Sequence, residues 1–391
     1  MRLTFIAALA ALPFAAAAIQ VCELDGQHVN PANGHTTAGK TGLMRCRDGE
    51  GGPVVREQEL RNGAFIGIVR YYKDGVLQRE YSVNERGNRD GIAREFAATP
   101  GPNNPLLREE TLRNSTTVGL ARSWHANGAL RRASFHGDDG REQAVAEFNA
   151  QGQLFELRCG PAPQLAPAAD DAAWCGHRGG PATVPLYATN GKPRGSIVYE
   201  RGELRRSEML WENGTPREQI EITREGGSER SFAADGTKRR EQKWVSVATQ
   251  DGRPRRITVL DQEFHTSGTL VRERRWLPDD RGASLTSEKR WYLNGQLREL
   301  IEATTVQGQR REASFHDNGQ PASDGLWLAG GRSDHQPSGV HKRFDDAGRL
   351  KLERHHDAQG RVTREREFDA GGQLLRDDEL FEDGSRKAYK R

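Results

Sequence analysis

The chain has 391 residues, of which 29% are charged and 35% hydrophobic, and its 58 basic and 55 acidic side chains leave a formal net charge of +3. A balance so close to neutrality gives no basic field suited to nucleic acid, so we expect no nucleic-acid partner. The low hydrophobic content argues against a thick closed core. After the N-terminal segment, no stretch approaches the roughly 20 apolar residues that a membrane span needs.

The first eighteen residues have the pattern of a cleaved export signal. Arg2 precedes an apolar run, and Ala15 to Ala18 supply a small-x-small cleavage site. A lipoprotein signal is not favoured, because Val21 before Cys22 is not the small residue that lipid attachment requires. We therefore expect residues 1–18 to be removed and the mature chain, without a transmembrane segment, to be periplasmic or secreted.

Four cysteines fit a protein that forms disulfide bonds outside the cytoplasm. The pairs that close short local loops are Cys22 with Cys46 and Cys159 with Cys175, although three connectivities are formally possible. The second pair brackets a Pro/Ala-rich interruption and would fix an otherwise flexible junction. A four-cysteine zinc site is the alternative, but there is no Cys-x-x-Cys pair to support it. We expect neither a metal nor a cofactor.

Residues 34–41 read GHTTAGKT and match the phosphate-loop pattern G-x-x-x-x-G-K-[ST]. That loop needs a buried strand before it and a helix after it, so that backbone amides can hold a phosphate. Here CELDGQHVNPAN precedes the match and GLMRCRDGEGG follows it, within the expected first disulfide loop. We therefore expect no nucleotide site.

Glycine recurs every twelve residues along much of the chain. The ladders are Gly39, Gly51, Gly63, Gly75 and Gly87; Gly128, Gly140 and Gly152; Gly202, Gly214 and Gly226; and Gly348, Gly360, Gly372 and Gly384. An aliphatic residue such as Leu350 follows two places after the glycine, and a large residue such as His356 follows eight places after it. Both offsets are even, so the two side chains share one face of a strand, and no helical period fits.

The spacing between aromatic residue and glycine predicts two kinds of turn. An aromatic four places before the glycine, as at Phe344 and Gly348, leaves a three-residue loop that ends in a left-handed glycine. In both kinds of turn, the aromatic is expected to pair with the residue two places after the glycine. An aromatic three places before the glycine then leaves a two-residue type I′ loop. The second kind comprises Tyr72 with Gly75, Trp211 with Gly214, Tyr292 with Gly295, and Phe381 with Gly384.

These repeats predict an all-β fold, an elongated antiparallel β-meander of roughly 25 to 29 strands in which each twelve-residue strand–turn unit contacts mainly its neighbours. We expect five segments: a signal peptide at 1–18, a cysteine-containing cap at 19–53, a first array at 54–158, a Pro/Ala-rich junction at 159–184 and a second array at 185–391.

Two stretches of the first array, residues 62–96 and 118–154, resemble the variant MORN repeats of YwqK-type proteins, a family named for toxin–antitoxin systems. They share its aromatic-x-Asn/Asp-Gly-x-Leu and Asn-Gly-x-x-x-Gly phrases, and the resemblance covers most of residues 61–391. It implies an elongated MORN-like β array and hints at a toxin or effector as partner. FDDAGRL and FDAGGQL also look like the YD repeats of large toxin shells, but a chain this short could not enclose cargo.

No nucleophile elbow, HExxH or paired-carboxylate signature is present, which indicates that the chain is not an enzyme. We expect an exported, non-catalytic protein-binding module, of an antitoxin or immunity type or one that acts in the cell envelope. A structural envelope protein and an enzyme acting on envelope polymers are the alternatives.

Binding specificity should come from places where the repeat is broken, because the regular units present the same charged rows. These places are residues 99–105, 159–180 and 320–340. The partner-binding candidates are Trp327, Asp334, His335 and His341, in the Gly-rich, off-ladder stretch of the second array. A tolerated surface insertion is the alternative. His341, His355 and His356 could approach one another, but His355 and His356 point to opposite faces of a strand, so we expect no metal site.

Overall fold

The computed structural model describes residues 20–98, 104–248, 254–279, 282–329 and 336–390. The expected signal peptide therefore lies outside the described residues, as do Asp334 and His335. The described residues contain 29 strands and two helices of four residues each. Each strand pairs in antiparallel fashion with its neighbours, which confirms the all-β meander. Neither helix has the length or apolar character of a membrane-spanning helix.

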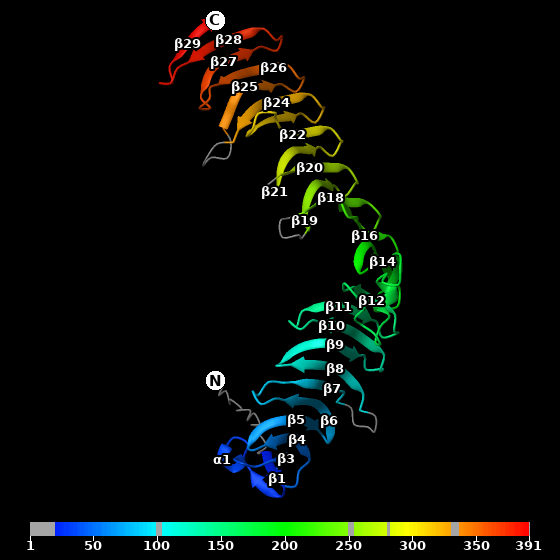
Figure 1. Cartoon of the computed structure of the whole chain (residues 1–391). Coiled ribbons are helices and arrows are strands. Elements are labelled where there is room, and N and C mark those ends of the chain that lie inside the picture. The colour runs from blue at the N-terminus through cyan, green and yellow to red at the C-terminus, as the bar shows by residue number, and fades with distance from the viewer. Residues whose placement is uncertain (1–19, 99–103, 249–253, 280–281, 330–335, 391) are drawn as a thin grey trace, which may run out of the picture. The chain divides into compact units, whose positions relative to one another are not determined.

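The strands form two sheets (Figure 1). The first sheet contains β1 (Gln20–Leu24), β2 (Gln27–Val29), β3 (Gly42–Asp48), β4 (Val54–Arg61), β5 (Ala64–Lys73), β6 (Val76–Val83), β7 (Gly91–Phe96), β8 (Leu106–Arg113), β9 (Thr116–Trp124), β10 (Leu130–His136), β11 (Glu142–Phe148) and β12 (Leu154–Arg158). The second sheet begins with β13 (Ala182–Tyr187), β14 (Pro193–Glu200), β15 (Glu203–Leu210), β16 (Pro216–Ile222), β17 (Gly226–Phe232), β18 (Lys238–Ala248), β19 (Pro254–Phe264), β20 (Leu270–Asp279) and β21 (Gly282–Trp291). It continues with β22 (Leu297–Ala303), β23 (Gln309–Phe315), β24 (Pro321–Leu328), β25 (Gln336–Phe344), β26 (Leu350–His356), β27 (Val362–Phe368), β28 (Leu374–Leu380) and β29 (Arg386–Lys390).

Strand order follows the sequence throughout both sheets, except that β1 lies between β2 and β3. The chain divides into two compact units. The first comprises Met1–Ala182, Leu186–Gly191 and Arg201–Glu203, and the second comprises Thr183–Pro185, Lys192–Glu200 and Leu204–Arg391.

The predicted glycine turns form as expected where the aromatic lies four places before the glycine. Phe344 pairs with Leu350. The Gly348 N–H donates to the Asp345 carbonyl at 2.9 Å, and Gly348 has φ +77°. A side chain is strained in this conformation, which explains why glycine recurs there.

The two-residue turn prediction is confirmed at Asp74 and Gly75, where both residues have positive φ, and is wrong at the other three predicted positions. At Trp211, the preceding residue Leu210 pairs with Pro216, so the loop has three residues and resembles the first kind. The same pattern occurs at Tyr292 and Phe381.

In the turns at Trp211 and Tyr292, the aromatic and the Asn bond to a neighbouring turn. The Trp211 indole N–H donates to the Phe232 carbonyl at 3.0 Å, and the Asn213 amide donates to the Ala234 carbonyl at 2.6 Å. Equivalent bonds join Tyr292 to Phe315, Asn294 to Asp317, Asn127 to Ala150 and Asn318 to Asp346. The asparagine side chain therefore links one turn to another. Its backbone does not adopt the left-handed conformation that a type I′ turn requires.

Gly226 belongs to the twelve-residue glycine series, which predicts a turn at this position, but it does not close a turn. It begins β17 and lies, with Gly227, against Trp244. A Cβ on Gly227 would approach the Trp244 ring to 2.4 Å, and the guanidinium of Arg256 covers that ring at 3.4 Å from its centroid. This glycine pair makes room for a buried ring.

Most hairpins also contain a β-bulge that the sequence pattern does not reveal. In β26 the register shifts between Leu350 and Leu352, which leaves Lys351, three places after Gly348, as the extra residue. Arg131 is the extra residue of β10, three places after Gly128. Such a bulge redirects one side chain without changing the pairing of the rest of the strand.

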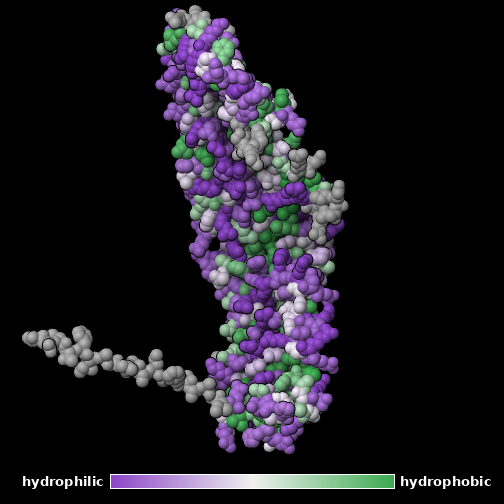
Figure 2. Space-filling view, turned by 90° about the vertical axis from the view of Figure 1, so that its left-hand side faces the viewer, coloured by the Kyte–Doolittle hydropathy of each residue, from purple (hydrophilic) through white to green (hydrophobic). Residues whose placement is uncertain are grey.

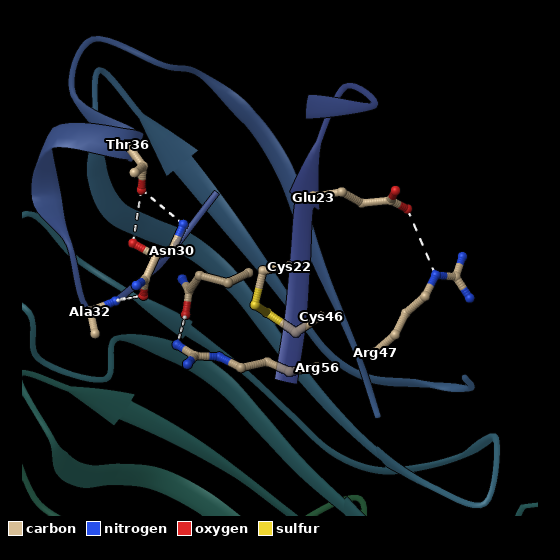
Figure 3. The surroundings of a disulfide bond; sticks show 9 residues. Cys22, Glu23, Asn30, Ala32, Thr36, Cys46, Arg47 and Arg56 are labelled. Atoms are coloured by element: carbon tan, nitrogen blue, oxygen red, sulfur yellow. Dashed lines mark hydrogen bonds and ion pairs between the residues drawn. A yellow bond between two sulfur atoms is a disulfide. The ribbon is translucent and has the colours of Figure 1, made fainter. Parts of the chain in front are cut away.

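An apolar cluster holds the N-terminal strands together. Cys22 and Cys46 are direct cross-strand partners and form one disulfide, which Figure 3 shows between β1 and β3. The buried members of the cluster are Cys22, Leu24, Val29, Met44, Cys46 and Leu60. The second disulfide joins Cys159 and Cys175, so both predicted pairings are confirmed and the zinc alternative is excluded.

Ion pairs take the place of an apolar core along many other strands. In β27, Glu365 is only 6% exposed and accepts hydrogen bonds from Arg354 at 2.7 Å and Arg386 at 3.0 Å. Hydrophilic side chains accordingly predominate on the face shown in Figure 2. The charged residues in the middle of such strands therefore contribute to cohesion between strands.

The phosphate-loop match lies in a different context from a nucleotide site. It spans the four-residue helix α1 (Gly34–Thr37), which follows the three-residue strand β2. Asn33 caps this helix through a bond to the His35 N–H at 3.1 Å. The buried strand and long helix that hold a phosphate are absent around this described segment.

Candidate functional site

The second unit has two rims with different properties. Consecutive antiparallel strands reverse direction, so alternate connections lie at opposite rims of the sheet. The regular rim consists of the connections 211–215, 233–237, 265–269, 292–296, 316–320, 345–349 and 369–373. All seven have five residues, with glycine fourth. The variable rim consists of the described connections 223–225, 304–308, 357–361 and 381–385 and of the strand ends that flank 249–253, 280–281 and 329–335. In the sequence, these connections range from two to seven residues.

Of the predicted partner-binding residues, Trp327 lies near the end of β24 and His341 lies in β25. The structure brings these two rings together, with centroids 5.0 Å apart in an edge-to-face arrangement. His356, at the end of β26, adds a third ring 4.5 Å from His341. We call Trp327, His341 and His356 the ring stack. It lies where β24 and β26 end at the variable rim.

Gly325 makes room for this stack. A Cβ at that position would come within 2.6 Å of the His341 ring. His341 is also fixed by a 2.7 Å hydrogen bond between its Nε2 and the Leu326 carbonyl. A carbonyl can only accept, so Nε2 carries the proton. The sequence shows Gly325 only as an off-ladder glycine, because its role depends on a ring from the next strand.

His356 is held in its neutral form. Burial, and then the nearby His341, lower the pKa of His356 from its ordinary value of 6.5. Its Nδ1 is buried and has no hydrogen-bond partner among the described residues. The lowered pKa favours the neutral form of the His356 ring, which adds to the aromatic surface of the stack.

His355 lies on the opposite face, as its position next to His356 predicts. Its Nε2 lies 2.8 Å from an oxygen of Glu353. Within the described ranges, no three His, Cys, Asp or Glu side chains are grouped so that they could hold a metal ion.

A small apolar cavity adjoins the ring stack at the variable rim. It has a volume of about 310 Å³ and is lined by residues that include Leu285, Ile301, Ala329 and Arg310. Arg310 is the cross-strand partner of Trp327, which places the cavity beside the stack. Leu285 is 40% exposed. The rings and this cavity together provide apolar surface within a largely charged sheet.

The junction at 159–180 is a compact structure in the first unit. Asp171 in the helix α2 (Asp171–Trp174) is 1% exposed and accepts the N–H groups of Gln164 at 2.6 Å and Leu165 at 3.0 Å. Trp174 packs against Phe148, with ring centroids 6.1 Å apart. These contacts order the segment together with the disulfide.

The junction also forms part of an apolar cavity. Leu130, Phe148, Trp174 and the segment 166–170 line a volume of about 470 Å³. The third predicted break, 99–105, lies mostly outside the described residues. Its Asn104 donates a hydrogen bond to the Leu77 carbonyl.

No protein-family model matches the chain, and no curated protein matches it either. Among solved structures, TarM from S. aureus is 9% identical with a TM-score of 0.20 over 29% of this chain, which spans 21% of TarM. The TcdB2-TccC3-Cdc42 structure is 10% identical with a TM-score of 0.16 over 90% of this chain and 23% of that one. A porin-like protein from Bacteroides uniformis is 8% identical with a TM-score of 0.15 over 76% of this chain and 92% of its own. Likenesses this small identify neither a family nor an activity.

Proposed function

We propose that this protein is an exported, non-catalytic repeat protein that binds another protein through the variable rim of its second unit. The observation that carries the proposal is the ring stack of Trp327, His341 and His356. Aromatic side chains on a rigid sheet are typical anchors of protein interfaces. The adjoining cavity can accept an apolar side chain of the partner.

Two further features support parts of this proposal. The two disulfides support export, because disulfides form and persist in oxidising compartments. The resemblance to the YwqK-type repeats suggests a toxin or effector, or another envelope protein, as the partner. We place the binding at the rim because its connections differ in length, whereas the strands repeat similar charged rows.

The test is capture from an envelope extract by the mature protein, followed by affinity measurement with the purified captured protein. Trp327→Ala should weaken that affinity by roughly thirtyfold or more, because an interface anchor contributes about 2 kcal/mol or more. Replacing residues 329–338 by a short Gly/Ser link should also weaken it.

The matched control is Leu293→Ala, which removes a large apolar side chain that is 60% exposed and lies on the regular rim, in the connection 292–296. It should leave the affinity unchanged. Equal affinity of all variants for the captured protein would contradict the assignment of the binding site to the ring stack. Release of fragments from envelope polymers by the purified protein would contradict the non-catalytic assignment.

A further inference from the structure

A small basic cavity lies over strands β8 to β11 of the first unit. Its volume is about 270 Å³, and four arginines, two serines, His136 and Glu142 are among its lining residues. This cavity is smaller than the range of about 300–1,000 Å³ typical of drug-sized ligands, so a ligand there would be small. The arrangement of its hydrogen-bond donors indicates what kind of group could bind.

Three of the arginines already have acidic partners. Arg122 pairs with Glu109, and Arg132 pairs with Glu142 and also with Glu147. Arg108 pairs with Glu110 at 2.9 Å. These pairs neutralise most of the arginine charge and fix the cavity wall.

Arg131 differs from the other three. It has no acidic partner among the described residues, and its Nε donates to the Ser123 hydroxyl oxygen at 3.3 Å. Arg131 is the extra residue of the bulge in β10. In a regular strand, adjacent Arg131 and Arg132 would point to opposite faces, but the bulge lets both line the same cavity.

The serines supply one further donor. Ser123 is 6% exposed, and its own O–H proton has no acceptor in the described part of the chain. His136 Nδ1 lies 3.2 Å from the Gly140 carbonyl and donates to it, because a carbonyl only accepts. In the neutral ring, Nε2 then accepts the Ser134 proton at 3.2 Å. A buried O–H without an acceptor is costly unless a ligand or water accepts its proton.

We propose that this cavity binds the oxyanion group, carboxylate or phosphate, of a small ligand. The planar guanidinium of Arg131 has N–H groups to spare after its bond to Ser123, and such a fork matches the two oxygens of an oxyanion. The Ser123 O–H supplies a neighbouring donor. The site lies in the first unit and does not depend on the partner binding proposed for the second.

The test is calorimetric titration of the full chain at low ionic strength with three probes: inorganic phosphate, D-glucuronate and D-glucose. We expect saturable binding, one ligand per chain, of phosphate or glucuronate, and none of glucose. Binding of one anion alone would identify whether phosphate or carboxylate is preferred. Arg131→Gln should weaken binding about tenfold or more, because it removes a charge-assisted hydrogen bond.

Arg141→Gln is the matched control, since Arg141 is 88% exposed at its side chain and does not line the cavity. It should change the affinity less than about twofold, as expected for an exposed charge. Ser123→Ala should weaken binding as Arg131→Gln does. Absence of saturable binding of both anions, equal binding of glucose, or an equal loss in Arg141→Gln would overturn the proposal.

Discussion

The two rims of the second unit follow from the same repeat but differ in how much variation they accept. On the regular rim, side chains such as Asn213 and Tyr292 bond to the carbonyl of a turn more than twenty residues ahead, so the geometry of one turn depends on another. On the variable rim, connection lengths range from two to seven residues. One rim therefore maintains the fold, and the other is free to carry a binding surface.

The largest loss of stability should come from weakening an ion pair within the strands, which run from one rim to the other. Asp377 is 6% exposed and receives both Nε and Nη2 of Arg364, at 2.8 and 2.7 Å. Asp377→Asn should lower the free energy of unfolding by about 1.5–3 kcal/mol, because it weakens hydrogen bonds between charged groups. Faster hydrogen exchange of β27 and β28 would show this loss, whereas unchanged exchange would contradict the role of the ion pair.

Low pH should remove the stabilisation by the ion pair of Asp377 and Arg364 without a mutation. The hydrogen bond from Arg364 is the main cause that holds the pKa of Asp377 below its ordinary value of 3.8. A lowered carboxyl pKa stabilises the fold above the ordinary value, and that contribution disappears as the pH falls through 3.8 and below it. Exchange of β27 and β28 should therefore rise over this range more in the native protein than in Asp377→Asn.

A smaller effect is expected from the regular rim at Gly236. This glycine has φ +84°, and a Cβ added to it would meet no atom within 4 Å, so substitution tests the backbone conformation alone. Gly236→Val should cost about 1–2 kcal/mol, measured by denaturant unfolding. Gly236→Asn is the control and should cost less, because Asn tolerates this conformation. Equal costs would mean that the turn conformation is not what glycine provides.

The smallest effect should come from a single bond between turns. Asn213→Asp keeps the side-chain oxygen that accepts the Thr215 N–H but removes the amide donor to the Ala234 carbonyl. We expect a loss of about 0.5–1.5 kcal/mol, with increased exchange in the turn at 233–237. Unchanged exchange in that turn would mean that the regular rim is not coupled from turn to turn.

The repeat, the strand direction and both disulfide pairings could be predicted from the sequence because each depends on local spacing. The position of Trp327 and His341 near a broken repeat could also be predicted, and the pairing of His341 with His356 was among the possibilities. The turns at Trp211, Tyr292 and Phe381 could not be predicted from the Asn/Asp-Gly dipeptide alone. At Trp211 and Tyr292, the deciding bonds reach a turn on another hairpin.

The cavity beside Arg131 and the burial of Glu365 also escaped prediction. Alternating charges predict ion-paired strand faces, but burial depends on how long arginine side chains cover a carboxylate on the next strand. The bulge at Arg131 has no residue signature of its own. A useful signal is a polar aromatic two places before Asn-Gly, as in WENG at Trp211 and YLNG at Tyr292, because both rings bond to the next turn.

The division into two rims makes the parity of the strand count important. Adding or deleting one twelve-residue unit before β24 would transfer every later connection, and the ring stack with them, to the other rim. Adding two units preserves every later position. Growth or shortening of this chain, by gene duplication or by design, should therefore proceed through whole hairpins of about twenty-four residues.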